Sequence, residues 1–477
     1  MHRRCRLGQS AVKPTPSADP PRPAAPNAAR GTGRWALRSR RVLVGRRLVD
    51  RAVVIDGERI VSILAPGDVP ADITVDDVGD HVVMPGVVDT QVRLADPGRA
   101  EWEGFDHGTR AAAAGGVTTL ADLPLPCNPV TATIEALEAK RWAAQGQLHV
   151  DVGLQAALLP GYQDQLEPLI DAGVVAFRSF LTDPGVSDCR QVGETDLESA
   201  LPVLERRGVT LFMHPERSPS GRPKRGPGTD PRSYAAYRAS RPSTWELDAV
   251  TLMARLCRQT GARVHLMPLT SAHAVEPLRA AMDGGLPLGA GTAPHYLSFA
   301  AEEIPDGDPR FKCRPPIRGD EHREGLWRAM RDGVLDLVAS DHSPAPAAKR
   351  CLETGDLRRA WPGIASVQLL LPATWTAALG HGFGLPDISQ WLSSRPASLL
   401  GLRDRKGQIA PGLDADLVIW DPEDTFDVHG ADLEHRHSQT PWSGARLFGV
   451  VHRTIVRGRT VYGAAGFAAA GGRLIER

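Results

Sequence analysis

The apolar positions near the two ends of the chain follow a short, strand-like pattern. Residues 40–64 alternate Val and Ile runs with polar residues around the turn pair Asp56-Gly57, which is typical of a β-hairpin. Residues 406–422 and 450–463 show the same short β-type runs, separated by glycine. Because chain termini often lie close together, we expect the two blocks, residues 35–84 and 405–477, to form one small β-sandwich.

Between these blocks, eight short apolar runs alternate with segments of helical periodicity, which include residues 131–145 and 243–261. Eight alternating β and α units predict an α/β fold in which residues 85–404 close into a (β/α)8 TIM barrel. The apolar runs span residues 86–92, 117–124, 149–158, 174–181, 209–216, 263–270, 286–297 and 335–344.

The polar residues that end these runs are the candidate functional residues. In a (β/α)8 barrel, functional side chains lie where the strands end at their carboxyl edge, so we expect these residues around one mouth. They are Gln91, Arg93, Asp122, Arg178, His214, Thr270, His295, Asp341 and His342.

The composition argues against some classes of partner. The chain of 477 residues is 42% hydrophobic, and 56 Lys and Arg residues balance 56 Asp and Glu residues, so no net charge favours nucleic acid or an anionic membrane. No apolar run approaches the ~20 residues that span a bilayer. Six scattered cysteines without C-x-x-C spacing indicate free thiols in a reducing compartment, and hence a cytoplasmic protein.

Residues 1–34 differ from the rest of the chain. They are rich in Pro, Ala and Arg, contain a single acid, Asp19, and lack the apolar stretch of a secretory signal. With so little apolar surface to bury, this segment is expected to be a disordered tail.

Several motifs, in the same order along the chain, resemble those of allantoinases, cyclic amidohydrolases close to hydantoinases and dihydroorotases. The resemblance extends from Leu37 to the C-terminus. It implies a (β/α)8 barrel with a flanking β-sandwich, homo-oligomeric assembly, and hydrolysis of a ring C–N bond in a small cyclic ureide or amide such as allantoin. The motifs include MPGVVDT, TRAAAAGGVTTLADLPL, SRPSTWE, FKCRPPIR, SDHSP and KGQIAPGLDADLVIWDP.

The resemblance also implies a site for two metal ions. Similar enzymes hold these ions with two histidines after strand one, a carboxylated lysine after strand four, and histidines after strands five and six. An aspartate after strand eight completes the site and also acts as general base. Imidazole and carboxylate oxygen suit Zn²⁺, which lowers the pKa of a bound water and polarises the substrate carbonyl.

At the corresponding positions this chain retains only two of the six ligands, His214 and Asp341. A catalytic zinc site usually has three protein ligands, and two guanidinium groups would repel a divalent cation. We therefore expect no metal cofactor here, although the resemblance alone would supply Zn²⁺. The other four positions hold Gln91, Arg93, Arg178 and Pro268.

The two arginines offer a partner for Asp341. Burying a lone carboxylate at the barrel mouth costs several kcal/mol of stability, and a bidentate pair with arginine would remove that cost. We therefore expect Arg93 or Arg178 to pair with Asp341. The alternative is that both arginines point to solvent.

Two functions of different classes stay open. As an enzyme, the protein would open or close a cyclic ureide without metal, with Arg93 or Arg178 polarising the carbonyl and Asp341 or His214 moving protons. As a non-catalytic homologue, it would bind a ligand or act as a scaffold for an active partner, because a fold alone implies no activity.

Three further residues are expected to bind the substrate in either case. They are His295, Arg318 and His342, of which His342 is also a candidate for proton transfer. The alternative for His295 is a structural hydrogen bond at the end of its strand.

Overall fold

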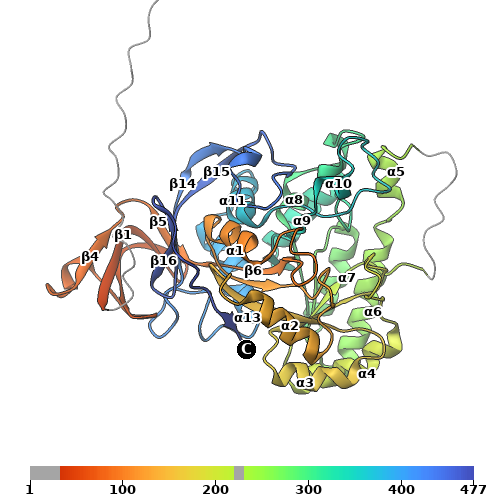
Figure 1. Ribbon diagram of the computed structural model, residues 1–477, viewed down its shortest axis with the longest axis horizontal. Helices are drawn as coiled ribbons and strands as arrows, with labels where there is room; N and C mark the ends of the chain where they lie inside the picture. The colour runs from red at the N-terminus through yellow and green to blue at the C-terminus, as the bar shows by residue number, and fades with distance from the viewer. Residues whose placement is uncertain (1–32, 220–229) are drawn as a thin grey trace, which may run out of the picture.

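A closed barrel of eight parallel strands forms the larger part of the computed structural model, which describes residues 33–219 and 230–477 (Figure 1). Each strand pairs with the next in chain order. A bridge between Val92 and His342 closes the ring, and the Arg93 amide donates to the His342 carbonyl at 2.9 Å. The strands are β6 (Val87–Val92), β7 (Val117–Asp122), β8 (Asp151–Ala157), β9 (Ala176–Phe180), β10 (Leu211–His214), β11 (Val264–Leu266), β12 (Leu288–Thr292) and β13 (Leu335–Val338).

The barrel strands form where the sequence has its eight apolar runs. Every residue of β6, β7, β8 and β9 is buried, as expected for parallel strands that are covered on both faces. Strand β11 is only three residues long, and Pro268 follows shortly after it. Proline has no N–H to donate to a neighbouring strand, so pairing cannot continue through this position. The predicted barrel is confirmed.

Helices cover the outside of the barrel (Figure 1). The two helical segments expected from periodicity are α2 and α6, and the Thr133 hydroxyl caps α2 by accepting from the Ala136 amide. The helices are α1 (Phe105–Ala114), α2 (Ile134–Ala144), α3 (Leu166–Asp171), α4 (Glu194–Arg206), α5 (Tyr234–Ala239), α6 (Thr244–Thr260), α7 (Val275–Asp283), α8 (Pro294–Ser298), α9 (Asp320–Arg331), α10 (Ala347–Arg350), α11 (Leu370–Leu379), α12 (Leu385–Ser389) and α13 (Arg395–Leu399).

A second sheet combines the two ends of the chain and forms the flanking β-sandwich. In Figure 1 the red and orange strands from the N-terminal block lie beside the blue strands from the C-terminal block, and β5 pairs with β14. The predicted hairpin at Asp56-Gly57 joins β2 to β3, with Asp56 opposite Arg59. The strands are β1 (Arg34–Val44), β2 (Arg47–Asp56), β3 (Arg59–Leu64), β4 (Thr74–Asp77), β5 (Val82–Pro85), β14 (Leu417–Asp427), β15 (Arg446–Val456), β16 (Arg459–Gly463) and β17 (Gly466–Phe467).

The last strand does not stay with the second sheet. Strand β18 (Leu474–Ile475) pairs with β8 of the barrel, so the C-terminal end of the chain returns to the larger domain. The residue boundaries between the two domains, expected at 84/85 and 404/405, stay a prediction.

A buried cluster of charges joins the barrel to the second sheet. Lys406 Nζ lies 2.7 Å from Asp151, the first residue of β8, and 2.6 Å from Asp416, which directly precedes β14. Asp414 is a third carboxylate partner at 3.0 Å, and Arg457 also pairs with Asp151. One ammonium group therefore links carboxylates from both sheets.

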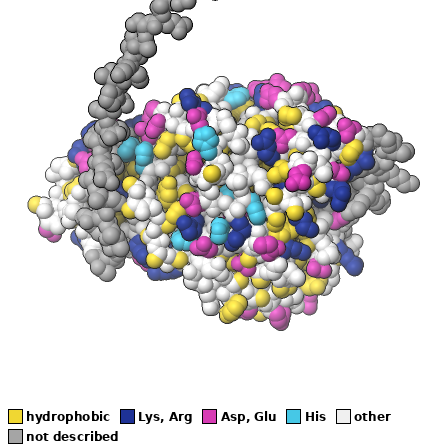
Figure 2. All heavy atoms as spheres, turned by 45° about the horizontal axis from the view of Figure 1, so that its top comes forward, with side chains coloured by type: hydrophobic (Ala, Val, Ile, Leu, Met, Phe, Trp, Pro, Cys, Tyr) yellow, Lys and Arg dark blue, Asp and Glu magenta, His cyan; other side chains and the backbone are white. Residues whose placement is uncertain are grey.

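Other sequence expectations concern the ends and the surface. The expected disordered tail, residues 1–34, lies outside the described residues except for Gly33 and Arg34, and Arg34 begins β1. Cys5 lies in the same undescribed segment, whereas the five described cysteines are free, as predicted. No described helix is both long and apolar enough to cross a bilayer. Figure 2 shows basic and acidic side chains interspersed over one face, in keeping with the zero net charge.

Candidate functional site

A pocket opens at the carboxyl ends of the barrel strands. Arg93 directly follows β6, His214 ends β10 and Asp341 lies three residues beyond β13, and all three line the pocket. These residues are far apart in sequence, and closure of the barrel brings them together. Further lining residues include Phe180, Asp183, Arg241, Arg314 and Trp361.

Arg178 lies on β9 beside this pocket, and the residue is only 1% exposed. Its Nη2 donates to the Met267 carbonyl at 2.9 Å, and its guanidinium carbon lies 5.2 Å from the centre of the Phe180 ring. Burial lowers the pKa of Arg178 to about 9. The positive charge of Arg93 adds to this shift, whereas the negative charge of Asp341 opposes it. The group therefore remains charged at neutral pH, and within the described residues its Nε and Nη1 have no hydrogen-bond partner.

Asp341 does not form the ion pair that the sequence predicts. Burial raises the pKa of its carboxyl group, and Arg93 and Arg178 oppose this only as nearby charges, without an ion pair in the described part of the chain. Each arginine is held by a nearer acceptor: Arg93 Nη1 donates to the Ser343 hydroxyl at 2.9 Å, and Arg178 donates to Met267. The alternative, with both arginines in solvent, is also wrong because Arg178 is buried.

The backbone at Asp341 has an unusual conformation. Its φ of 48° lies in the left-handed region, which residues other than glycine seldom adopt. Such positions are enriched at functional sites, where the surrounding structure holds them in place.

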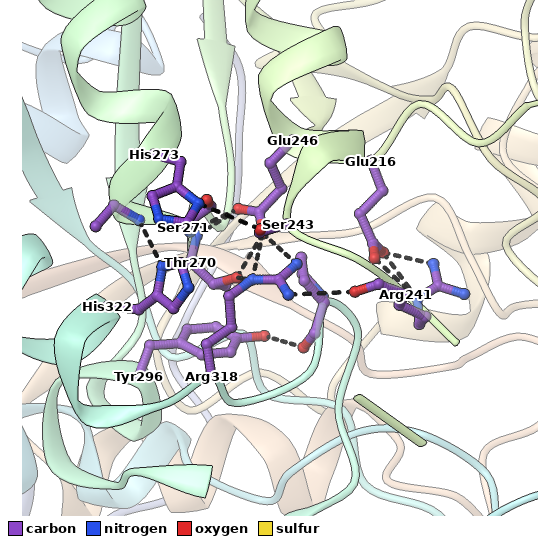
Figure 3. A network of polar contacts seen from close by, with 12 residues as sticks. Glu216, Arg241, Ser243, Glu246, Thr270, Ser271, His273, Tyr296, Arg318 and His322 are labelled. Carbon is purple, nitrogen blue, oxygen red and sulfur yellow. Dashed lines mark hydrogen bonds and ion pairs between the residues drawn. The ribbon is translucent and has the colours of Figure 1, made fainter. Parts of the chain in front are cut away.

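His214 is the first member of a short chain of polar contacts. Its Nε2 lies 2.8 Å from Glu216 Oε2. Arg241 Nε donates to both oxygens of that carboxylate at 2.9 and 3.1 Å (Figure 3). Burial lowers the pKa of His214 to about 4, although Glu216 opposes the shift. The neutral ring therefore donates from Nε2 to Glu216, which leaves Nδ1 as its acceptor atom.

Arg318 belongs to a separate network that is centred on Glu246 (Figure 3). Its Nε and Nη2 donate to Glu246 Oε1 at 2.8 and 2.6 Å, and its Nε also contacts the Thr270 hydroxyl at 2.9 Å. Its Nη1 reaches the Arg241 carbonyl at 3.2 Å, so Arg318 supports the loop that carries Arg241. Its role in substrate binding stays a prediction, since it does not appear among the described lining residues of the pocket.

His295, His342 and Gln91 are fully buried. Both ring nitrogens of His295 and both amide atoms of Gln91 lack a partner within the described residues, and burial lowers the pKa of His295 to about 3. His342 Nδ1 accepts from the amides of Ser366 and Val367 at 3.0 and 3.2 Å. The described pocket lining includes neither histidine, so their substrate contacts also stay predictions.

The side chains at the mouth do not fit two metal ions. Arg178 cannot be carboxylated and keeps a positive charge, and Arg93 adds a second positive charge beside Asp341. His214 and Asp341 are the only two ligand-type side chains at the family positions. Within residues 33–219 and 230–477, no group of three or more potential ligands lies at this mouth.

Elsewhere, three groups of ligand-type atoms are close enough to hold a metal ion. Asp151, Asp414 and Asp416 already surround the Lys406 ammonium, and the His273 group depends on Glu321, whose side chain is 77% exposed. The third group, His81, Asp421 and His452, lies on the second sheet. It weakens the expectation that the chain binds no metal at all, but it does not contribute to the barrel mouth.

The residues that sequence reasoning missed are Glu216, Arg241 and Arg314. Arg241 and Arg314 lie in the motifs SRPSTWE and FKCRPPIR, and Glu216 follows His214 by two positions. These motifs pointed to the segments, but they did not indicate which side chain in each would face the pocket.

In sequence, the chain is similar to cyclic amidohydrolases. A model of the amidohydrolase family matches residues 259–461. A protein of Oryza sativa subsp. japonica named "Probable allantoinase" is 40% identical over 447 residues, which cover 90% of this chain and 87% of that protein. An allantoinase of Streptomyces avermitilis is 40% identical over 444 residues, which cover 92% of this chain and 98% of that protein.

The three-dimensional comparison agrees with the sequence comparison. The L-hydantoinase (dihydropyrimidinase) from Arthrobacter aurescens superposes with a TM-score of 0.85 at 26% identity, covering 93% of this chain and 99% of that chain. A D-hydantoinase superposes with the same TM-score at 23% identity, a likeness that concerns the fold alone.

Proposed function

Because the chain belongs to the amidohydrolase family and is an allantoinase-like member of it, we propose that its barrel mouth binds a small cyclic ureide or the ring-opened product without the two metal ions of the family reaction. In this proposal the protein does not open allantoin at an ordinary enzymatic rate. It acts as a ligand-binding homologue.

Arg178 is the observation that carries this proposal. It stands where similar enzymes have a carboxylated lysine, and it is only 1% exposed. The side chains around this position therefore pack against a guanidinium group. A buried positive charge at this position opposes a divalent cation by direct repulsion. The substitutions at Gln91, Arg93 and Pro268 remove three further ligands and so act in the same direction.

Without metal-bound hydroxide, the remaining side chains can support only weaker chemistry. Arg93 is placed to polarise a carbonyl oxygen, and His214 Nδ1 or the Asp341 carboxylate would have to take a proton from water. An arginine cannot generate hydroxide, so ring opening through these groups is expected to be slow. This favours the non-catalytic alternative over a metal-free hydrolase.

Metal analysis beside an allantoin hydrolysis assay tests the proposal. Wild-type protein purified with added zinc should carry much less than one zinc per chain and should leave allantoin unchanged. A variant with Gln91→His, Arg93→His, Pro268→His and Arg178→Lys should recover metal binding, because it restores the missing ligand types.

A matched variant separates ligand restoration from loss of charge. It carries the same three histidines with Arg178→Gln, which removes the positive charge but cannot form a carboxylated lysine. The lysine variant should retain more metal than the glutamine variant. Wild-type protein that purifies with close to one zinc per chain and rapidly hydrolyses allantoin would contradict the proposal.

Two properties of the whole protein are also proposed here. Homo-oligomeric assembly follows from the family resemblance and is tested by light scattering of the purified chain. A cytoplasmic location is supported by the five free cysteines of the described residues, and cell fractionation tests it.

A further inference from the structure

Three guanidinium groups line the barrel-mouth pocket, and a fourth lies beside it. Arg93, Arg241 and Arg314 line it, and Arg178 lies close enough to influence the titration of the lining residues Asp341 and His214. They come from separate parts of the chain: the end of β6, the segment between α5 and α6, the segment before α9, and β9.

Among the described residues, only one of these four groups has its charge neutralised by an ion pair. Arg241 is paired with Glu216. In the described part of the chain, Arg93, Arg178 and Arg314 form no ion pair; Arg93 donates to the Ser343 hydroxyl, and Arg178 and Arg314 donate to the carbonyls of Met267 and Pro184. The Nε atoms of all three are buried without a hydrogen-bond partner in that same part of the chain.

Two carboxylates lie near these unpaired cations, and they are too few. Asp341 faces Arg93 and Arg178 without direct contact, and Asp183 is on the exposed rim. Buried charges in proteins are normally paired, because an unpaired charge in a medium of low polarity is costly. Two unpaired guanidinium groups in the pocket wall and a third beside it outnumber these two carboxylates, and the remaining positive charge favours an anion.

The shape and chemistry of the pocket favour a carboxylate on a flat ligand. Arginine presents two parallel N–H donors that match a carboxylate or a phosphate. The aromatic rings of Phe180 and Trp361 line the same pocket and offer apolar surface to a planar ureide group.

We infer that this pocket binds an open-chain ureido carboxylate in preference to the neutral cyclic ureide, with Arg93 and Arg314 receiving the carboxylate. The inference rests on the proposed function, because membership of the family supplies the ureide part of the ligand. Arg178 adds fixed positive charge beside the pocket, and Glu216 holds Arg241 in the wall.

Isothermal titration of the full chain with matched probes tests the inference. N-carbamoylglycine is the anion, hydantoin is the neutral ring that it forms on losing water, and N-carbamoylglycine amide is a neutral open chain. N-carbamoylglycine should bind at least about tenfold more tightly than either neutral compound, since charge-assisted hydrogen bonds are the stronger kind. Its affinity should also fall as salt concentration rises.

Substitutions show whether the arginines cause this preference. Arg93→Gln and Arg314→Gln should each weaken N-carbamoylglycine binding by about tenfold and should weaken binding of the neutral compounds much less. Arg279→Gln on α7, which removes a surface pair with Asp332, is the matched control and should bind as wild type does. Thermal unfolding shows whether each variant is folded. If one arginine variant does not fold, the other still tests the inference.

The opposing outcomes are distinct. Equal affinity for the charged and neutral compounds, or unchanged binding in both arginine variants, would overturn the inference. Inorganic phosphate that binds more tightly than N-carbamoylglycine would show a general anion site and would overturn the ureide part. The affinity ratio requires neither metal nor turnover, so the metal content and hydrolysis assay judge the proposed function separately.

Discussion

At the scale of single residues, Arg178 shows how one substitution changes what a barrel mouth can do. Its guanidinium is buried, and burial is the largest influence on its lowered pKa. It has one carbonyl acceptor, Met267, and no ion pair within the described residues. Its charge therefore costs solvation energy in the free protein, and an anionic ligand would offset that cost.

Replacing Arg178 with methionine tests this description. Arg178→Met keeps side-chain length and removes the buried charge, so the free energy of unfolding should rise by about 1–2 kcal/mol despite loss of one hydrogen bond. Denaturant unfolding without ligand measures it, with the surface change Arg279→Met expected to stay within about 0.5 kcal/mol of wild type. A loss of about 3–5 kcal/mol would instead mean that Asp341 depends on a direct pair with Arg178.

At the scale of elements, the amino end of β8 and the start of β14 are joined through Lys406. Three carboxylates surround its ammonium group, and all four side chains are almost completely buried. The largest apolar cluster already contains residues of both parts, such as Leu120 of the barrel and Trp420 of the second sheet, so the charge cluster adds to an apolar contact between them. The site depends on it only indirectly, because the pocket lies at the opposite end of the barrel strands.

Removing the Lys406 charge should be strongly destabilising. After Lys406→Met, Arg457 still pairs with Asp151, and Arg59 and Arg405 still pair with Asp414, but Asp416 keeps no ion pair among the described residues. Leaving this buried carboxylate unpaired should cost about 3–5 kcal/mol. Chemical denaturation measures the loss. The exposed Lys349→Met change is the control and should alter stability by less than about 0.5 kcal/mol. If Lys406→Met also changed the free energy of unfolding by less than about 0.5 kcal/mol, the prediction would be wrong, and protonation of the carboxylates would have replaced the lost ion pairs.

At the scale of the whole molecule, buried neutral histidines link folding to pH. His435 Nε2 accepts from the Gln368 amide at 3.2 Å, and burial lowers the pKa of His435 to about 3, with His342 adding to the shift and Glu103 opposing it. His295 and His322 are also buried, and burial lowers their pKa values to about 3 and about 4. All three must stay neutral in the folded chain.

The protein should therefore lose stability in mild acid. Below a pKa of about 6.5 the unfolded chain binds protons that these folded histidines do not, so the stabilisation is complete above that pH and is lost as pH falls. Urea unfolding between pH 7 and pH 5 should show this slope. Asp89, whose pKa burial raises to about 6, binds a proton in the folded chain within this range and reduces the slope, because a single carboxyl opposes several histidines. His435→Gln should flatten the slope, whereas the exposed His429→Gln change should leave it as in wild type.

The sequence by itself determined the barrel, the two-ended second sheet and the segments that form the mouth. Eight apolar runs became β6–β13, and the Asp56-Gly57 turn became the β2–β3 hairpin. These features depend on local patterns of apolar and polar residues, which can be recognised in the sequence without knowledge of the fold. The family motifs also placed Arg93, His214 and Asp341 at one pocket, because strand ends of a closed barrel must meet.

Only the tertiary structure decided which side chains pair and which face the pocket. Arg93 or Arg178 was expected to pair with Asp341, but in the folded chain Arg93 donates to Ser343 and Arg178 donates to Met267. Arg241 and Arg314 enter the pocket from segments whose paths the sequence pattern does not describe. The choice of hydrogen-bond partner depends on distances of a few ångströms between residues far apart in sequence, and such distances exist only after the chain has folded.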